Sequence, residues 1–318
     1  MKKIDILMAT YNGEKYISEQ IESILNQTYS NFRLIISDDC STDNTRKILE
    51  SFRKKDKRIK IYFQEKNMGY IKNFEFLLNK VENELYMLSD QDDIWNADKV
   101  EKSINKMLEK HADLVFCDLL LVNQNGELIS NSFWKEKKLK RKIKKDKNKI
   151  GLRLNNYITG CTILSKKSFL KYVLPLPSNT KYLIHDFWIA VVISLKGKIE
   201  YIEEPLVKYR QHQSNQVGYK MKSKTLKSID EIRNMFIDVK IELFSIYCKR
   251  KELFTLKEQE TNIRALRYYQ DLKTTENIYL KNWGFFFKLY YYEDIGYKIA
   301  NFIILNIPVV AKILYKRR

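Results

Sequence analysis

Three carboxylates stand within four positions, at Asp90, Asp92 and Asp93, directly after an apolar run at 85–88. The run is typical of a buried strand, and carboxylates crowded at its end repel one another, which raises their pKa in an apolar neighbourhood. A divalent cation removes the repulsion, because Mg²⁺ and Mn²⁺ prefer oxygen ligands from one or two carboxylates and from substrate phosphates. We therefore expect a metal–phosphate site at Asp90 and Asp92. The alternative is an acidic loop that only caps the helix starting near Asp98.

The segments around this stretch alternate between strand and helix patterns. Three apolar runs between residues 4 and 63 are typical of strands, and each is followed by apolar residues at helical spacing. Strands that alternate with helices predict βαβ units and a mainly parallel sheet. Ligands of such sheets bind beyond the carboxyl ends of the strands, where Asp90 falls and where Asp38 and Asp39 follow the second run. We therefore expect two strands to deliver acidic groups to one edge.

The first turn, at 10–13, is not a common phosphate loop, because the chain has neither GxGxxG after the first strand nor GxxxxGK[ST]. Phosphates must then be held by a metal and by basic side chains. The simplest ligand is a nucleoside diphosphate whose base or ribose meets the acidic pair after the second strand. The basic and aromatic segment at 208–215 suits pyrophosphate oxygens or a metal. We expect Arg210 and His212 to close over the pyrophosphate.

Asp186 follows His185 at the start of an apolar helical run at 189–195, after two prolines, Pro175 and Pro177, break the chain. An acidic residue in the first turn of a helix is often only a cap. A cap is therefore the default interpretation of Asp186 from the residues alone.

Composition narrows the class of protein. The 318 residues allow one large domain with an appendage, or two domains, and 44% hydrophobic and 13% aromatic residues exclude a disordered chain. The four cysteines form no CxxC pair, which argues against a zinc site and a disulfide framework and suits a reducing cytosol. The N-terminus lacks a signal-peptide pattern, and no apolar run approaches the roughly 20 residues of a membrane-spanning helix.

The formal net charge of +19 calls for an acidic partner. Nucleic acid is not favoured, because no zinc-finger, RRM or helix-turn-helix signature is present. Ten of the fifteen residues at 135–149 are Lys or Arg, and Lys316-Arg317-Arg318 ends the chain. An anionic membrane surface or a lipid-linked phosphate substrate fits such clusters. The alternative for 135–149 is a solvated, flexible loop.

From about Ser223 the pattern becomes helical. Apolar residues at helical spacing at 229–272 favour helix–helix packing within the protein. The stretch at 283–318 is aromatic, interrupted and basic, so it is too short and broken to span a bilayer but suits a peripheral position on one. The alternative is packing against the rest of the chain or against a second copy in a homodimer. We expect domains at 1–220 and 221–318.

These motifs together resemble family 2 glycosyltransferases of the GT-A fold. The match covers about residues 4–218 in the family order, and its later motifs are most similar to bacterial rhamnosyltransferases of surface polysaccharide synthesis. Residues 219–318 carry no motif that we can place. The matching stretches are Ala9-Thr10-Tyr11-Asn12-Gly13, Gln27-Thr28-Tyr29, Ser37-Asp38-Asp39-Cys40-Ser41-Thr42-Asp43, Asn67-Met68-Gly69, Ser89-Asp90-Gln91-Asp92-Asp93-Ile94-Trp95, Thr159-Gly160-Cys161, His185-Asp186-Phe187-Trp188 and Tyr209-Arg210-Gln211-His212.

The resemblance implies roles for individual residues. It makes Asp92, together with Asp90, the ligand of the metal, and it makes Asp186 the catalytic base. The family often has Glu-Asp at the base, so His185 departs from that pattern. The nucleotide sugar is then expected at Thr10, Tyr11, Asn12, Asp38, Asp39, Asn67, Gly69, Asp90, Arg210 and His212. The acceptor side is expected at Thr159, Gly160, His185 and Trp188.

The implied activity is that of an inverting hexosyltransferase that depends on Mg²⁺ or Mn²⁺. The expected donor is dTDP-rhamnose, with a UDP-hexose as the alternative. The expected acceptor is a saccharide carried on a lipid, in the synthesis of a surface polysaccharide such as a capsule. Such an enzyme is expected in the cytoplasm, at the inner face of the cell membrane.

Two other classes compete with this interpretation. Sugar-phosphate nucleotidyltransferases also have acidic strand ends, but they need a Gly-rich, Arg-bearing loop after the first strand, and the turn at 10–13 is not one. A basic module that binds membranes or nucleic acid would fit the net charge. That module leaves the acidic strand ends unexplained.

Overall fold

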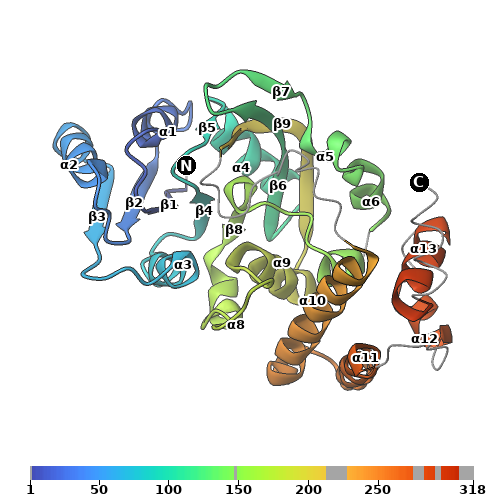
Figure 1. The fold of residues 1–318 in the computed structure, drawn as a ribbon. Helices are drawn as coiled ribbons and strands as arrows, with labels where there is room; N and C mark the ends of the chain where they lie inside the picture. The colour runs from blue at the N-terminus through green and yellow to red at the C-terminus, as the bar shows by residue number, and fades with distance from the viewer. Residues whose placement is uncertain (1, 147–148, 213–227, 275–282, 291–294, 308–318) are drawn as a thin grey trace. The chain divides into compact units, whose positions relative to one another are not determined.

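The computed structural model describes residues 2–146, 149–212, 228–274, 283–290 and 295–307 (Figure 1). Contacts within the chain define two compact units. The first unit comprises residues 1–140, 157–178 and 184–220. The second unit comprises residues 141–156, 179–183 and 221–318.

The first unit is built on one sheet, which contains nine strands in the described residues. The strand order is β3-β2-β1-β4-β8-β6-β9-β5, and β7 pairs with β6. The longest pairings, β1 with β2 and β6 with β9, are parallel, whereas the antiparallel pairings extend over only two or three residues each. The mainly parallel α/β sheet predicted from the sequence is therefore confirmed. The strands are β1 (Ile4–Thr10), β2 (Phe32–Asp38), β3 (Ile59–Phe63), β4 (Leu85–Ser89), β5 (Ile94–Trp95), β6 (Leu114–Asn123), β7 (Leu128–Ser130), β8 (Leu164–Lys166) and β9 (Ile199–Gln211).

Helices flank this sheet (Figure 1). Helix α1 buries Ile17, Ile21 and Ile24, which recur every three or four residues and so lie on one face. Helix α9 differs, because His185 to Ser194 are all buried, as expected for a helix enclosed within a core. The helices of this unit are α1 (Ile17–Leu25), α2 (Thr45–Lys55), α3 (Tyr70–Leu78), α4 (Lys99–Glu109), α5 (Phe133–Glu136), α8 (Leu170–Val173) and α9 (His185–Lys196), with short 3₁₀ turns η1 (Gly160–Thr162) and η2 (Lys167–Phe169).

The strand register brings the acidic strand ends to one edge. Thr10 of β1 pairs with Asp38 of β2, and Met8 of β1 pairs with Ser89 of β4. The loops that follow β1, β2 and β4 therefore leave the sheet at the same edge. Asp90 lies directly beyond that edge, as the βαβ pattern predicts.

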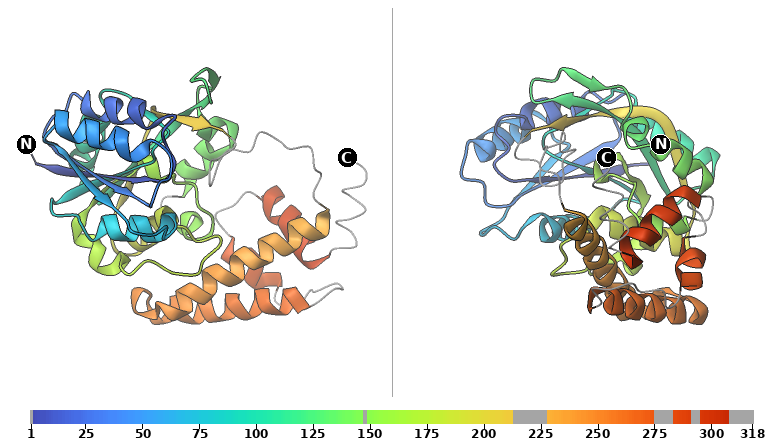
Figure 2. Two further views of the ribbon diagram at one scale, coloured as in Figure 1. Left: turned by 60° about the vertical axis from the view of Figure 1, so that its left-hand side comes forward. Right: turned by 45° about the vertical axis from the view of Figure 1, so that its right-hand side comes forward.

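The second unit is helical, which confirms the predicted helical C-terminal region. Figure 2 shows α10 and α11 side by side as a hairpin. A capping box starts α10, where the Ser228 hydroxyl accepts the N–H of Glu231 and the Glu231 carboxylate accepts the N–H of Ser228. The elements are α7 (Ile150–Leu154), α10 (Ile229–Lys249), η3 (Lys251–Leu253), α11 (Leu256–Thr274), α12 (Trp283–Leu289) and α13 (Ile295–Asn306), and α6 (Leu139–Lys145) lies across the boundary of the two units.

Two buried or partly buried charged residues of α10 bind the shorter segments of this unit. The Lys240 ammonium is buried and donates to the carbonyl of Leu154 and, at 2.9 Å, to the side-chain oxygen of Asn155. The Glu242 carboxylate accepts the three backbone N–H groups of residues 181–183 at 2.8 to 2.9 Å. These bonds explain why segments distant in sequence belong to the second unit.

The basic segment at 135–149 is not the flexible loop that was the alternative interpretation of its composition. Its described residues include part of α5 and all of α6. Trp134 and Ile143 are buried at 2% and 1% exposure, so each short helix is anchored by one apolar side chain. The basic side chains of α6 at Lys140, Arg141 and Lys144 remain exposed.

Within the described part of the chain, no helix combines the length and the apolar character needed to cross a membrane.

The hydrogen bonds of buried Arg233 predict that this residue stabilises the second unit. Its guanidinium donates to the carbonyls of Leu305, at 3.0 Å, and Leu272, at 2.7 Å, near the ends of α13 and α11. Arg233→Met keeps the length of the side chain but removes both bonds, so we expect the free energy of unfolding to fall by about 3 kcal/mol in urea titrations. Exposed Arg267→Met is the matched control and should change it little. Equal stability of the two variants would contradict this role.

Candidate active site

The acidic loop after β4 is held against the loop after β1. The side-chain amide of Gln91 accepts the backbone N–H of Tyr11 at 2.8 Å and donates to the carbonyl of the same residue at 3.0 Å. A Cβ at Gly13 would lie 2.4 Å from Gln91 Oε1, so a larger residue there would displace the Gln91 side chain. Gln91 lies between two predicted metal ligands, and no role was predicted for it from the sequence.

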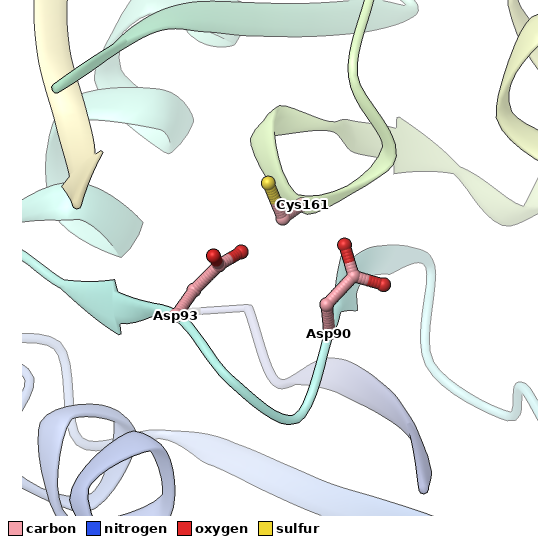
Figure 3. A group of neighbouring side chains, drawn as sticks. All are labelled: Asp90, Asp93 and Cys161. Atoms are coloured by element: carbon pink, nitrogen blue, oxygen red, sulfur yellow. The ribbon is translucent and has the colours of Figure 1, made fainter. Parts of the chain in front are cut away.

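Asp90, Asp93 and Cys161 form a cluster at the end of β4 (Figure 3). One oxygen of each carboxylate and the Cys161 sulfur all lie within 4.8 Å of one another. Burial raises the pKa of Asp90 to about 7, and the charges of Asp92 and Asp186 add to the increase. Burial and the neighbouring carboxylates also raise the pKa of Asp93 and of the Cys161 thiol well above their usual values. Three acidic groups here therefore compete for protons unless a cation is bound.

Asp92 contacts a different partner. Its Oδ2 lies 2.8 Å from Nε2 of His212, which follows β9. Divalent transition metals bind both carboxylate oxygens and imidazole nitrogens. Mg²⁺ and Mn²⁺ prefer a carboxylate oxygen to a protonated thiol. Among the described residues, Asp90 and Asp93 lie close enough together, with Cys161, to hold a hard divalent cation. Asp92 pairs with His212 instead, so its contact with a metal stays a prediction. Cys161 fits such a cation less well, because its thiol must lose a proton to ligate.

Arg210 binds the acidic loop to its surroundings. The guanidinium is 3% exposed; its Nε donates to the Asp92 carbonyl at 2.9 Å and its Nη2 to the Glu19 carboxylate at 2.5 Å. It also lies over the Tyr16 ring, with 4.7 Å between the guanidinium carbon and the ring centroid. The predicted contact of Arg210 with a pyrophosphate stays a prediction, whereas the structure shows the contact with the acidic loop. Glu19 and Tyr16 were not singled out from the sequence.

The two carboxylates after β2, Asp38 and Asp39, accept hydrogen bonds that fix the neighbouring loops. Asp38 accepts the N–H of Ser41 at 3.0 Å and the Arg46 Nε–H at 2.8 Å, and its other oxygen accepts the Thr10 hydroxyl at 3.2 Å. Asp39 accepts two backbone N–H groups of residues 68–69, each at 2.8 Å. Both carboxylates are buried. They therefore shape the edge of the sheet through bonds that the residue types alone do not reveal.

The other residues predicted to bind nucleotide gather at the same edge. Asn12 has a left-handed backbone, with φ of 48°, and its side-chain oxygen accepts the N–H of Thr42 at 2.9 Å. Gly69 has φ of 83°, which favours glycine, and its N–H also binds the Asn67 side chain at 3.1 Å. Tyr11 is 44% exposed beside them, so its ring is open to a flat ligand.

Asp186 lies in the first turn of α9. Its Oδ2 accepts the N–H of Gly160 at 2.9 Å, and its Oδ1 accepts the N–H of Phe187 at 2.5 Å. The Gly160 bond joins it to a different segment, which a simple helix cap does not do. Burial raises the pKa of Asp186 to about 7. Asp186 and Asp90 are near enough for the charge of Asp186 to raise the pKa of Asp90.

The residues predicted for the acceptor side make different kinds of contact in the structure. Gly160 lies against both Asp186 and His185, since a Cβ there would be 3.4 Å from Asp186 Cβ and from His185 Nε2. Trp188 is fully buried, and its indole N–H donates to the Val173 carbonyl at 2.9 Å. Thr159 contributes its carbonyl to the turn at η1, where it accepts the Thr162 hydroxyl at 2.6 Å. Their roles toward an acceptor stay predictions.

Lys99 is a buried charged residue for which the sequence predicted no role. Its ammonium lies 3.3 Å from the centroid of the Trp95 ring and has no hydrogen-bond partner within the described residues. Burial lowers the pKa of Lys99 to about 8, and the charges of Cys117, Cys161 and Asp93 oppose the decrease. The sequence offers only a weak signal, a lysine at the start of the helix after the acidic loop.

Comparisons with known proteins agree with this geometry. The family model for Glycosyl transferase family 2 matches residues 5–173. The chain is 31% identical over 243 residues to the dTDP-rhamnosyl transferase RfbG of Shigella flexneri, a match that covers 71% of this chain and 79% of RfbG. It is 37% identical over 124 residues to WfgD of Escherichia coli, a UDP-Glc:alpha-D-GlcNAc-diphosphoundecaprenol beta-1,3-glucosyltransferase, covering 39% of this chain and 48% of WfgD. For several such relatives the match spans about half of their length.

The fold of this chain is also similar to that of a solved structure. The S. aureus TarS structure in complex with UDP-GlcNAc matches with a TM-score of 0.59 at 20% identity, covering 98% of this chain and 83% of that chain. The sheet therefore has the GT-A fold that the sequence predicted. The chain belongs to glycosyltransferase family 2.

The pairing of Asp92 with His212 predicts how metal dependence responds to mutation. Asp92→Asn removes a charge but keeps the shape, so we expect an intact fold and a loss of divalent-stimulated turnover of about 10²-fold or more. The measurement is nucleoside diphosphate release with and without Mn²⁺ and EDTA. Asp98→Asn is the matched control, since Asp98 pairs only at the surface with Lys102, and it should keep wild-type stimulation. Full activity of wild type in EDTA would contradict the metal site.

Proposed function

We propose that this protein is an inverting, metal-dependent glycosyltransferase that moves a sugar from a nucleotide donor to a hydroxyl of a saccharide. The observation that carries the proposal is the position of Asp186. It is buried, held by the Gly160 N–H, and electrostatically coupled to Asp90 at the acidic strand end. A base beside a metal–diphosphate site is the arrangement that a single in-line displacement needs.

In the proposed mechanism Asp186 takes the proton from the attacking acceptor hydroxyl. The hydroxyl oxygen forms a bond to the anomeric carbon as the bond from that carbon to the diphosphate oxygen breaks. Asp90 and Asp92, with His212 as a further donor, would hold a divalent cation, which would supply Lewis-acid neutralisation of the departing diphosphate. Arg210 holds the Asp92 carbonyl and so fixes the acidic loop in place. Direct contact of Arg210 with the pyrophosphate is a further element of the proposal.

The nucleotide is proposed to bind at the edge formed by the loops after β1, β2 and β3. The exposed Tyr11 ring supports this position, because a base can stack on it. Asp38 and Asp39 support it indirectly, by holding the loops of Thr10 and Gly69 in shape. Asn12 and Asn67 present amide groups at the same edge.

The proposed donor is dTDP-rhamnose, with a UDP-hexose as the alternative. The likeness to RfbG, a dTDP-rhamnosyl transferase, supports the first, and the likeness to WfgD, which is named for UDP-Glc, supports the second. Incubating the pure protein with a panel of nucleotide sugars and measuring released nucleoside diphosphate separates them. Release from no donor, with Mn²⁺ present, would overturn the proposed function.

The proposed acceptor is a lipid-linked saccharide at the inner face of the cell membrane, for synthesis of a surface polysaccharide. The acceptor printed in the name of WfgD, a GlcNAc diphospho-lipid, supports the lipid. The exposed basic residues of α6 support an anionic surface. The tail supports it less than expected, because Phe285, Phe286 and Tyr290 are buried and the Tyr290 hydroxyl lies 2.8 Å from that of Tyr269. Residues 291–292 and 316–318, which belong to the same prediction, lie outside the described residues.

The raised pKa of Asp186 predicts the pH dependence of transfer. Burial favours the protonated acid, so the carboxylate that acts as base forms only as the pH rises through about 7. We therefore expect kcat/KM to increase between pH of about 6 and 8. Asp186→Asn should lose about 10²- to 10⁴-fold in transfer while it still binds nucleotide. Lower thermal stability with wild-type transfer would show that Asp186 is only a cap.

The basic face of α6 predicts reversible membrane binding. The intact protein should pellet with anionic phosphatidylglycerol vesicles at low salt and dissociate as salt rises, since each basic residue near such a surface contributes about 1 kcal/mol. Replacing Arg141, Lys144 and Lys145 with Gln should weaken binding. The same replacement of Lys47, Lys54 and Lys55 on α2, which are also exposed, is the control. Failure of the wild type to pellet at low salt rules out the membrane proposal.

A further inference from the structure

His185 occupies an aromatic setting at the start of α9. Its ring stacks on Phe74 of α3, with 3.9 Å between centroids and 15° between the planes. The Tyr70 ring meets it edge-on at 6.2 Å. These contacts fix the plane of the imidazole, so its two nitrogens point along defined directions.

Neither nitrogen of His185 has a hydrogen-bond partner within the described residues, although the side chain is buried at 7% exposure. Buried polar atoms are nearly always paired, and an unpaired one costs about 1–3 kcal/mol in general. A leucine or a phenylalanine would pack against Phe74 without the cost of unpaired polar atoms. The unpaired nitrogens therefore indicate a ligand that the described part of the chain does not itself supply.

The position of His185 identifies where that ligand lies. His185 Nε2 and Asp186 Oδ2 are within 3.5 Å of one point, the position that a Cβ on Gly160 would occupy. His185 Nε2 and Asp186 Oδ2 therefore both border the position that a side chain at residue 160 would occupy. The group that meets Asp186 in the proposed mechanism is the attacking hydroxyl of the acceptor.

We propose that His185 is a specificity-determining residue that hydrogen-bonds, through Nε2, a second hydroxyl of the acceptor sugar next to the attacking one. This inference rests on the proposed glycosyl transfer. Burial lowers the pKa of His185 to about 3, so the ring is neutral and has one donor and one acceptor nitrogen. A sugar hydroxyl, which donates and accepts, suits such a ring. A carboxylate at this position could only accept.

The test replaces His185 with Phe, which keeps the stacked ring and removes both nitrogens. We expect kcat/KM for the acceptor to fall about tenfold, the size of one buried hydrogen bond, mainly through KM. Donor hydrolysis by water and affinity for UDP or dTDP should not change, and the melting temperature should stay or rise. His185→Gln, which restores a donor and an acceptor, should recover part of the loss. Ile189→Val, one turn further along the same helix, is the control and should leave the acceptor KM unchanged.

The probes are N-acetylglucosaminyl diphosphate on a short alkyl chain and a panel of methyl glycosides, used with the donor that wild type accepts. A wild-type acceptor KM for His185→Phe would overturn the inference, because the ring would then be only a core aromatic. If the Phe variant does not fold, the acceptor KM of His185→Leu tests the inference in the same way. Donor turnover by wild type without transfer to any saccharide would instead overturn the proposed function, which separates the two failures.

Discussion

The structure depends on the crowding of buried carboxylates beyond β4. Asp93 and Asp186 are buried and Asp90 is half-buried, and removal from water raises the pKa of each. Like charges in so small a volume are tolerated only if protons or a cation offset them. The surrounding bonds keep this arrangement closed: Arg210 holds the backbone of the acidic loop from one side, and Gln91 joins it to the loop after β1. Under the proposed function, a cation and a diphosphate would meet this arrangement already formed.

Much of the fold could be predicted from the sequence, because apolar periodicity reports directly on which face of an element is buried. The runs that became β1, β2 and β4 ended at polar residues, and the parallel order followed from the helices between them. The roles of Asp38 and Arg210 could not be predicted in the same way. Their partners, Arg46 and the carbonyl of Asp92, depend on how loops meet in the folded chain. Trp188 shares the motif of Asp186 but is buried in the core.

The second unit also shows that the sequence predicts helices better than it predicts the partners of their side chains. Helical spacing predicted α10 and α11, whereas aromatic and basic composition alone suggested a membrane-facing tail. Phe286 and Tyr290 instead pack within the unit, since aromatic side chains gain as much from a protein core as from a lipid surface. Composition could not distinguish the two environments, because burial in either removes the same apolar area from water. The basic residues of α6, which stay exposed, now carry the argument for an anionic surface.

The central claim is that one base, Asp186, drives a single displacement at the anomeric carbon. A single displacement inverts the configuration of that carbon, whereas a covalent glycosyl-enzyme intermediate retains it. Proton NMR of the first product formed from a donor of known anomeric configuration measures this directly, through the coupling constant or the carbon–proton coupling of the anomeric centre. The account predicts a product of opposite configuration to the donor. A product of the same configuration would contradict it.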